Sequence, residues 1–322
     1  MSSALVVAAG IGGSLWLLSY AIEALRTVPK PPAALRWAPD IPIQYVEVDG
    51  NRLRFIKSGS GPVLVLLHTL RTQLDLFEKV IPDLSKTFTV YALDLPGHGF
   101  SDIPTGNYDA AFFVQAVEGF LDKLDLRDVT LAGVSIGGSI SLLLAARHNA
   151  RVARVVAINP YDYAKGRGLA RSSLLGGFFT YVSLIPVVGE TVMRLRMVPI
   201  VNAVFRGGVV NADSISPALM KEMYLVGNRP GHYGAFIALL RNSESWERAT
   251  KEYVRITTPV LFVWASEDWA RPSERRHDES LVPGAATVTI AGGGHFLPLD
   301  KPDAVIARLK NLAGQSSSET SA

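Results

Sequence analysis

The sequence contains the pentapeptide Gly133-Val134-Ser135-Ile136-Gly137, which ends the apolar run 129–134 and begins a segment rich in small residues. This order predicts a strand that turns sharply into a helix at Ser135. Glycines two positions before and after the serine suit such a turn, because a Cβ at either position would clash. The turn would raise the hydroxyl above the sheet edge and direct the helix amino terminus at developing negative charge. Ser135 is therefore the predicted nucleophile.

A serine nucleophile needs a base to activate it, and the base needs an acid to orient it. Among the six histidines, only His295 lies just beyond a predicted final strand, in the glycine-rich loop 292–296. Asp268 follows the predicted strand 260–264 by four residues, at the sheet edge where ligands bind in this class of fold. Glu267 and Asp162 remain alternative acids. The predicted triad is Ser135, Asp268 and His295, a chain order associated with one hydrolase architecture.

Short apolar runs alternate with helical patterns over most of the chain. Runs that are apolar throughout are typical of parallel strands buried on both faces. The predicted fold class is therefore α/β, with a mostly parallel sheet covered by helices on both faces and a helical cap insertion. The predicted core comprises residues 43–160 and 256–313, and the cap comprises 161–255. The predicted strands are a hairpin at 43–48 and 53–56, then 63–67, 88–93, 129–134, 155–158, 260–264 and 286–290, and the predicted core helices include 108–124, 140–148 and 302–312.

Composition excludes several functional classes. Apolar residues make up 48% of the 322 residues and charged residues 19%, which rules out a disordered chain. The absence of cysteine excludes disulfides, zinc–thiolate sites, iron–sulfur clusters and thiol nucleophiles. A net charge of +3 without a long basic run does not predict nucleic-acid binding. No cofactor fingerprint or metal-ligand cluster is found, so neither a cofactor nor a metal is predicted, and the oligomeric state is left open.

The amino-terminal segment carries no charged side chain over residues 4–22 and would span about 28 Å as a helix. It predicts a membrane anchor over residues 1–25, with a cleaved signal peptide and a buried or interfacial helix as alternatives. The basic residues that follow it favour a single-pass protein whose catalytic domain is cytoplasmic. Five prolines indicate an extended linker over residues 26–42, and the serine-rich tail 314–322 is predicted to be disordered.

Residues 43–312 resemble the α/β-hydrolase fold superfamily, in its capped serine hydrolase branch. Besides the pentapeptide, residues 94–102 (DLPGHGFSD) resemble the family loop D-x-x-G-x-G-x-S, and residues 294–302 (GHFLPLDKP) resemble its G-H-x-x-x-x-E/D-x-P ending. Epoxide hydrolases and haloalkane dehalogenases of this family carry Asp at the position of Ser135, on the sharp strand-to-helix turn called the nucleophile elbow. Ser135 instead suits attack on a carbonyl carbon and an acyl-enzyme intermediate.

The resemblance also implies an oxyanion hole made by the backbone amides of Leu70 and Ile136. The family usually has His-Gly-x after the third strand, whereas this chain has His68 followed by Thr69. The Cβ of Thr69 alters the expected loop geometry, and its hydroxyl could add a third donor. Arg71 could do the same if it turns inward; the alternative is a surface cation. His68 is expected to brace the loop.

The cap segment 174–210 is rich in apolar residues. These residues either pack on the core and line the pocket, or face a bilayer and admit a lipophilic substrate. The leading hypothesis is a membrane-anchored serine hydrolase that cleaves a carboxylic ester or thioester of a small lipophilic substrate, with membrane lipid bound through the amino-terminal helix. The alternatives are a carbon–carbon bond hydrolase and a non-catalytic binding protein of the same fold.

Overall fold

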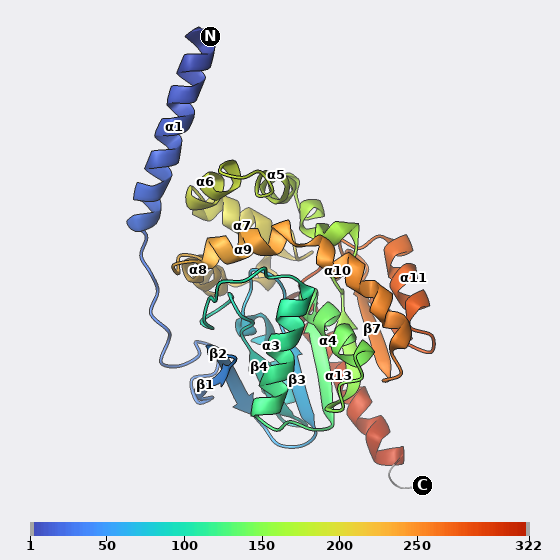
Figure 1. The fold of residues 1–322 in the computed structure, drawn as a ribbon. Helices are drawn as coiled ribbons and strands as arrows, with labels where there is room; N and C mark the ends of the chain where they lie inside the picture. The colour runs from blue at the N-terminus through green and yellow to red at the C-terminus, as the bar shows by residue number, and fades with distance from the viewer. Residues whose placement is uncertain (1–2, 320–322) are drawn as a thin grey trace.

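An eight-stranded sheet forms the centre of the computed structural model, which describes residues 3–319 and the side chains of residues 12–311 (Figure 1). Its order is β1-β2-β4-β3-β5-β6-β7-β8; β2 runs antiparallel to β1 and β4, and all other neighbours are parallel. The predicted α/β class with a mostly parallel sheet is confirmed. The strands are β1 (Ile43–Val48), β2 (Asn51–Ser58), β3 (Val63–Leu67), β4 (Thr89–Leu93), β5 (Val129–Val134), β6 (Val152–Ile158), β7 (Val260–Ala265) and β8 (Ala286–Ile290).

Helices cover both faces of this sheet. The helices α3 (Ala110–Lys123) and α4 (Ile136–Ala146) lie in front of it in Figure 1, whereas α2 (Ile81–Leu84) and α13 (Pro302–Glu319) pack together on the other side. The side chain of Asp109 accepts a hydrogen bond from the amide of Phe112 and so begins α3. Every residue of α4 is buried, because the helix lies between the sheet and other helices. The helices α11 (Pro272–Leu281) and α12 (Leu297–Asp300) complete the core.

The carboxyl-terminal segment differs from its prediction. Helix α13 continues to Glu319, so residues 314–319 are helical where disorder is expected from the serine-rich composition. Residues 320–322 lie outside the described part of the chain.

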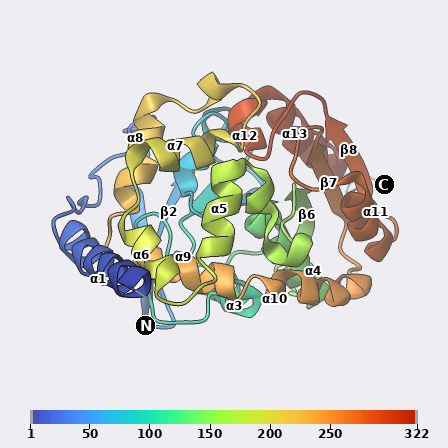
Figure 2. The same cartoon turned by 90° about the horizontal axis from the view of Figure 1, so that it is seen from above.

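The segment between β6 and β7 is helical and lies over one end of the sheet (Figures 1 and 2). Seen from above, α5 covers the centre of the molecule, and α6 lies to one side of it, next to α1 (Figure 2). Several side chains of this region remain exposed, among them Phe178, Tyr181 and Met197. The cap helices are α5 (Leu174–Val182), α6 (Val188–Arg194), α7 (Val198–Arg206), α8 (Pro217–Val226), α9 (His232–Arg241) and α10 (Glu244–Ala249), with short 3-10 turns at 164–166, 168–171, 212–214 and 250–255.

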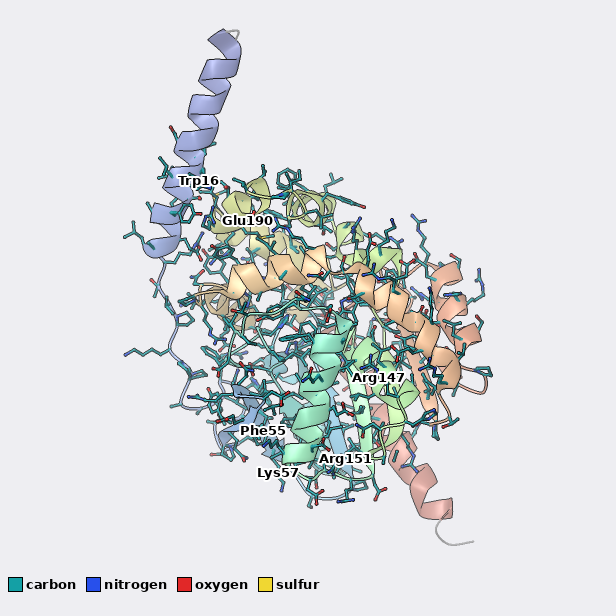
Figure 3. All side chains as sticks on the ribbon, in the orientation of Figure 1. Trp16, Phe55, Lys57, Arg147, Arg151 and Glu190 are labelled. Carbon is teal, nitrogen blue, oxygen red and sulfur yellow. The ribbon has the colours of Figure 1, made fainter. Side chains whose placement is uncertain are left out.

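The predicted membrane span is wrong. In the part of the chain that the structure describes, no helix combines the length and the apolar character needed to cross a membrane. The amino-terminal helix α1 (Ser3–Ala24) instead packs its carboxyl-terminal half beside α6, where Trp16 lies near the helix that carries Glu190 (Figure 3). The prediction of a single-pass membrane protein with a cytoplasmic catalytic domain depended on that span and is therefore wrong as well.

Polar contacts attach one face of this half of α1 to the cap, while apolar side chains such as Leu17 and Leu18 remain exposed. Ser19 is fully buried and accepts a hydrogen bond from Arg194 Nε at 2.9 Å. The same guanidinium lies over the ring of Tyr20, 3.9 Å from its centroid. Glu23 accepts a hydrogen bond from Arg196 Nη1 at 2.8 Å. Charged and hydroxyl groups on one face of the helix are thus paired with the cap rather than exposed to hydrocarbon.

Candidate active site

Ser135 occupies a strained turn between β5 and α4. Its φ of 60° and ψ of −121° lie outside the regions that L-residues ordinarily adopt. A Cβ on Gly133 would lie 2.1 Å from the backbone of Gly137, and a Cβ on Gly137 would lie 2.3 Å from the carbonyl oxygen of Leu67. Both glycines are therefore required by close backbone approach, as the sequence predicts. The turn places Ser135 at the amino terminus of α4.

His295 and Asp268 come together at the same edge of the sheet. Asp268 follows β7 and His295 follows β8, and His295 Nδ1 donates a hydrogen bond to Asp268 Oδ1 at 2.5 Å. Both side chains are fully buried. The second carboxylate oxygen of Asp268 accepts the amide of Ala270 at 3.0 Å, so the carboxylate is oriented from two sides. This arrangement leaves His295 Nε2 free to exchange a proton with a nucleophile.

The two alternative acids do not contact His295. Glu267 is exposed, and its side chain makes no hydrogen bond or ion pair within the described residues. Asp162 is buried elsewhere: its Oδ2 accepts hydrogen bonds from Tyr253 at 2.6 Å and from Ser139 at 3.3 Å. Burial raises the pKa of Asp162, which makes it a poor partner for an imidazolium. Among the three candidate acids, the structure thus brings only Asp268 to the histidine.

Three polar atoms at this edge have no hydrogen-bond partner within the described residues: Ser135 Oγ, His295 Nε2 and Thr69 Oγ1. A buried polar atom without a partner costs about 1–3 kcal/mol. The serine and histidine therefore do not bond to one another in this structure, although both are fully buried. Catalytic hydrogen bonds are often long without substrate and tighten in the complex.

The predicted oxyanion donors lie on neighbouring segments. Strand β3 pairs with β5 so that Leu67 is opposite Gly133, and the loop after β3 therefore passes beside the amino terminus of α4. Within the described residues, the amides of Leu70 and Ile136 donate no hydrogen bond. Two free amides next to a buried hydroxyl can bind an oxyanion. The residue after Leu70, Arg71, has a left-handed φ of 60°.

His68 braces this loop, as predicted. The amide of Leu95 donates to His68 Nε2 at 2.9 Å, and His68 Nδ1 donates to the carbonyl of Thr69 at 2.7 Å. Burial lowers the pKa of His68 to about 4, so the imidazole is neutral at neutral pH and fits both contacts. It links the oxyanion loop to the 94–102 loop and is too fully bonded for proton transfer.

Two supports of His295 are absent from the sequence-based prediction. The indole of Trp269 stacks on the imidazole with ring centroids 3.8 Å apart, and its Nε1 donates to the carbonyl of Gly207 in the cap at 3.0 Å. Asn159, which follows β6, donates to the carbonyl of His295 at 3.2 Å and accepts the amide of Ala265 at 2.8 Å. The sequence indicates these two residues only by their positions, because Trp269 and Asn159 each follow a predicted strand.

Asp300 joins the histidine loop to the cap. Its carboxylate accepts the amides of Gly294, Val210 and Asn211 and the hydroxyl of Ser214. Burial opposes its ionisation, but these hydrogen bonds outweigh burial and lower the pKa of Asp300. The acid in the 294–302 motif is therefore a structural brace.

A cavity lies between the cap and the triad and contains about 640 Å³ of empty space, part of it open to solvent. Its wall includes Leu70, Trp269 and Phe296, which are neighbours of the triad. Ser135 Oγ itself is inaccessible, so a substrate must displace side chains of this wall to reach it. The cap contributes mainly apolar side chains, namely Phe179, Met193, Ile200, Val201, Val204 and Phe205.

Comparison with known proteins agrees with this architecture. The model of the family described as alpha/beta hydrolase fold matches residues 62–302. A haloalkane dehalogenase of Psychrobacter cryohalolentis is 30% identical over 287 residues, covering 81% of this chain and 88% of the relative. An uncharacterised protein of Mycobacterium tuberculosis is 27% identical over 273 residues, covering 81% and 77%.

Solved structures show the same fold. The wild-type Cfl2 protein of Burkholderia cenocepacia superposes with a TM-score of 0.76 at 24% identity, over 89% of this chain and 99% of that one. A likeness at this identity concerns the fold alone. Together with the family match over most of its length, it shows that the chain belongs to the α/β hydrolase fold family and is related to hydrolases.

Proposed function

We propose that the protein is a serine hydrolase that cleaves a carboxylic ester or thioester through an acyl-enzyme intermediate. The observation that carries this proposal is the meeting of three groups at one edge of the sheet: Ser135 on its strained turn, and His295 bonded to Asp268. A serine at this turn attacks a carbonyl carbon, whereas the dehalogenases and epoxide hydrolases that this family resemblance includes use a carboxylate at the same position.

The reaction follows from the positions of these groups. Ser135 Oγ attacks the carbonyl carbon, and its proton passes to His295 Nε2 while Asp268 stabilises the imidazolium. The amides of Leu70 and Ile136 receive the oxyanion. The bond to the leaving oxygen or sulfur then breaks, and the leaving group takes the proton from His295. Water attacks the acyl-enzyme with His295 as base, which releases the acid and regenerates the Ser135 hydroxyl.

The cavity supports a lipophilic substrate. Its cap wall is mainly apolar, so each methylene of a bound acyl chain leaves water for a hydrocarbon environment. Each buried methylene contributes about 0.8 kcal/mol, or roughly a fourfold gain in kcat/KM while the chain still fits. A non-catalytic protein of this fold would be expected to lack a triad member, and all three are present.

The test is a series of p-nitrophenyl esters with acetyl, butyryl, hexanoyl and octanoyl groups, assayed with the wild-type protein and Ser135→Ala. We expect kcat/KM to rise with chain length and to vanish in the variant. Ester turnover that survives in Ser135→Ala would refute the proposal. Cleavage of a vinylogous 1,5-diketone without any ester turnover would assign a carbon–carbon bond hydrolase instead.

A further inference from the structure

Arg71 is the unusual charged residue of the cavity. It follows the oxyanion donor Leu70 directly, and both residues line the cavity. Its guanidinium donates from Nη1 to His232 Nδ1 at 2.8 Å and lies over the ring of Phe236, 5.2 Å from the centroid. It is therefore held by the cap and turned inward, not placed at the surface as a solvated cation.

No carboxylate balances this charge. Among the described residues, Arg71 forms no ion pair with any acidic side chain. The charge of Glu23 acts on Arg71 and raises its pKa, but that carboxylate already bonds to Arg26 at 2.9 Å and to Arg196 at 2.8 Å. The second arginine of the cavity wall, Arg196, has a carboxylate partner in Glu23, which it shares with Arg26, whereas Arg71 has none among the described residues.

The histidines around Arg71 cannot supply negative charge and do not add positive charge at neutral pH. His232 accepts a hydrogen bond from Arg71, and burial together with the nearby guanidinium lowers its pKa well below the usual range. Burial and the neighbouring His68 likewise lower the pKa of His98 to about 3. Both imidazoles are therefore neutral, and among the described residues the guanidinium of Arg71 has no carboxylate to compensate its charge.

An unbalanced guanidinium in an apolar cavity costs free energy that an anionic ligand can recover. Burial and the neighbouring Arg196 lower the pKa of Arg71 to about 9, which still leaves it charged near neutral pH. Guanidinium binds carboxylate through two parallel hydrogen bonds, and such charge-assisted bonds are stronger than neutral ones. The cavity therefore offers an anion site one residue from the oxyanion loop.

We propose that Arg71 binds a free carboxylate of the substrate, so that the preferred substrates are esters or thioesters whose apolar part carries a second, ionised carboxyl group. This inference rests on the proposed function for the scissile bond. The apolar cap wall would hold the methylene chain between the two carbonyl groups, and Arg71 would select against a chain that ends without charge.

The kinetic test compares mono-p-nitrophenyl suberate with its methyl ester, which has the same chain and no charge. We expect the wild-type protein to favour the charged ester in kcat/KM by on the order of 10- to 100-fold. The ratio should fall close to one in Arg71→Met and stay partly elevated in Arg71→Lys. Arg206→Met is the matched control, because Arg206 is exposed at the end of α7 and its loss changes the net charge equally.

An equal preference in the wild-type protein, or a ratio that Arg71→Met leaves unchanged, would overturn the inference. A purely structural role for Arg71 would lower both rates together and leave the ratio as it is. Calorimetry with Ser135→Ala separates the inference from the proposed function. In that background monomethyl suberate should bind at least 10-fold more tightly than dimethyl suberate, whether or not the wild-type protein hydrolyses either ester.

Discussion

Replacing Asp268 with asparagine tests the proposed proton path at the contact that is best defined. The Asp268 carboxylate accepts two N–H groups, from His295 Nδ1 at 2.5 Å and from the amide of Ala270 at 3.0 Å. An asparagine amide has one oxygen and one NH₂ group. If the asparagine oxygen accepts from His295, its NH₂ group faces the amide of Ala270 and that contact is lost. If the oxygen accepts from Ala270 instead, the NH₂ group faces His295 Nδ1, and this contact survives only with the reversed tautomer of the imidazole.

The magnitude follows from what the contact does. The wild-type carboxylate stabilises the imidazolium that forms when Ser135 attacks, and a neutral amide does not. In the comparable serine protease case the same change lowers kcat by about 10⁴-fold, which is about 5.4 kcal/mol of transition-state stabilisation. We expect a loss of this order in Asp268→Asn, with little change in KM because the carboxylate does not line the cavity.

The assay is steady-state hydrolysis of p-nitrophenyl hexanoate, with circular dichroism to confirm that each variant is folded. Glu267→Gln is the control, because this neighbour is exposed and its side chain makes no hydrogen bond or ion pair within the described residues. It should stay within about twofold of the wild-type rate. Retention of more than about a tenth of the activity in Asp268→Asn, or a larger loss in Glu267→Gln, would refute the assignment of the acid.

Three further predictions concern stability. Burial is the main cause that raises the pKa of Asp278 to about 10, and the neighbouring Asp162 raises it further. The folded state therefore binds more protons than the unfolded state from about pH 4 to about pH 10, so stability should fall as pH rises through that window. In Asp278→Asn, denaturation at about pH 5 and about pH 8 should show a flatter dependence, by up to about 1.4 kcal/mol per pH unit; an unchanged slope would contradict the assignment. Gly137→Ala should lower the free energy of unfolding by about 1–3 kcal/mol and remove activity, because its Cβ would lie 2.3 Å from a carbonyl oxygen of β3. An unchanged free energy of unfolding in urea would show that the turn at Ser135 can relax. Glu23→Ala should cost on the order of 2 kcal/mol, because it leaves the buried guanidinium of Arg196 without a carboxylate, and an unchanged melting temperature would show that α1 contributes nothing.

The core of the fold could be predicted from the sequence because its signals are local. Predicted strands 43–48, 63–67, 129–134 and 286–290 match β1, β3, β5 and β8 residue for residue. A run of apolar residues bounded by turns is sufficient to place β3 and β5, which are buried, whereas alternation of apolar and polar residues places the edge strands β1 and β8. The elbow was also predictable, since the strand, the serine and its two glycines are contiguous in the chain.

The fate of α1 could not be predicted in the same way. Its apolar composition suggested a membrane span, whereas the structure pairs Ser19 and Glu23 with arginines about 175 residues further along the chain. Hydropathy counts the residues of one segment and has no access to such distant partners. The inward direction of Arg71 depends in the same way on His232 and Phe236 of the cap, and the stacking of Trp269 on His295 joins two separate loops.

The central claim is that Ser135 is the nucleophile and that His295 and Asp268 activate it. The most direct measurement is peptide mass spectrometry of the full chain after reaction with a fluorophosphonate. A single phosphonyl adduct on the peptide that contains Ser135, slowed strongly in Asp268→Asn and absent in Ser135→Ala, is the predicted result. An adduct on another residue, or no adduct in a folded protein, would contradict the account.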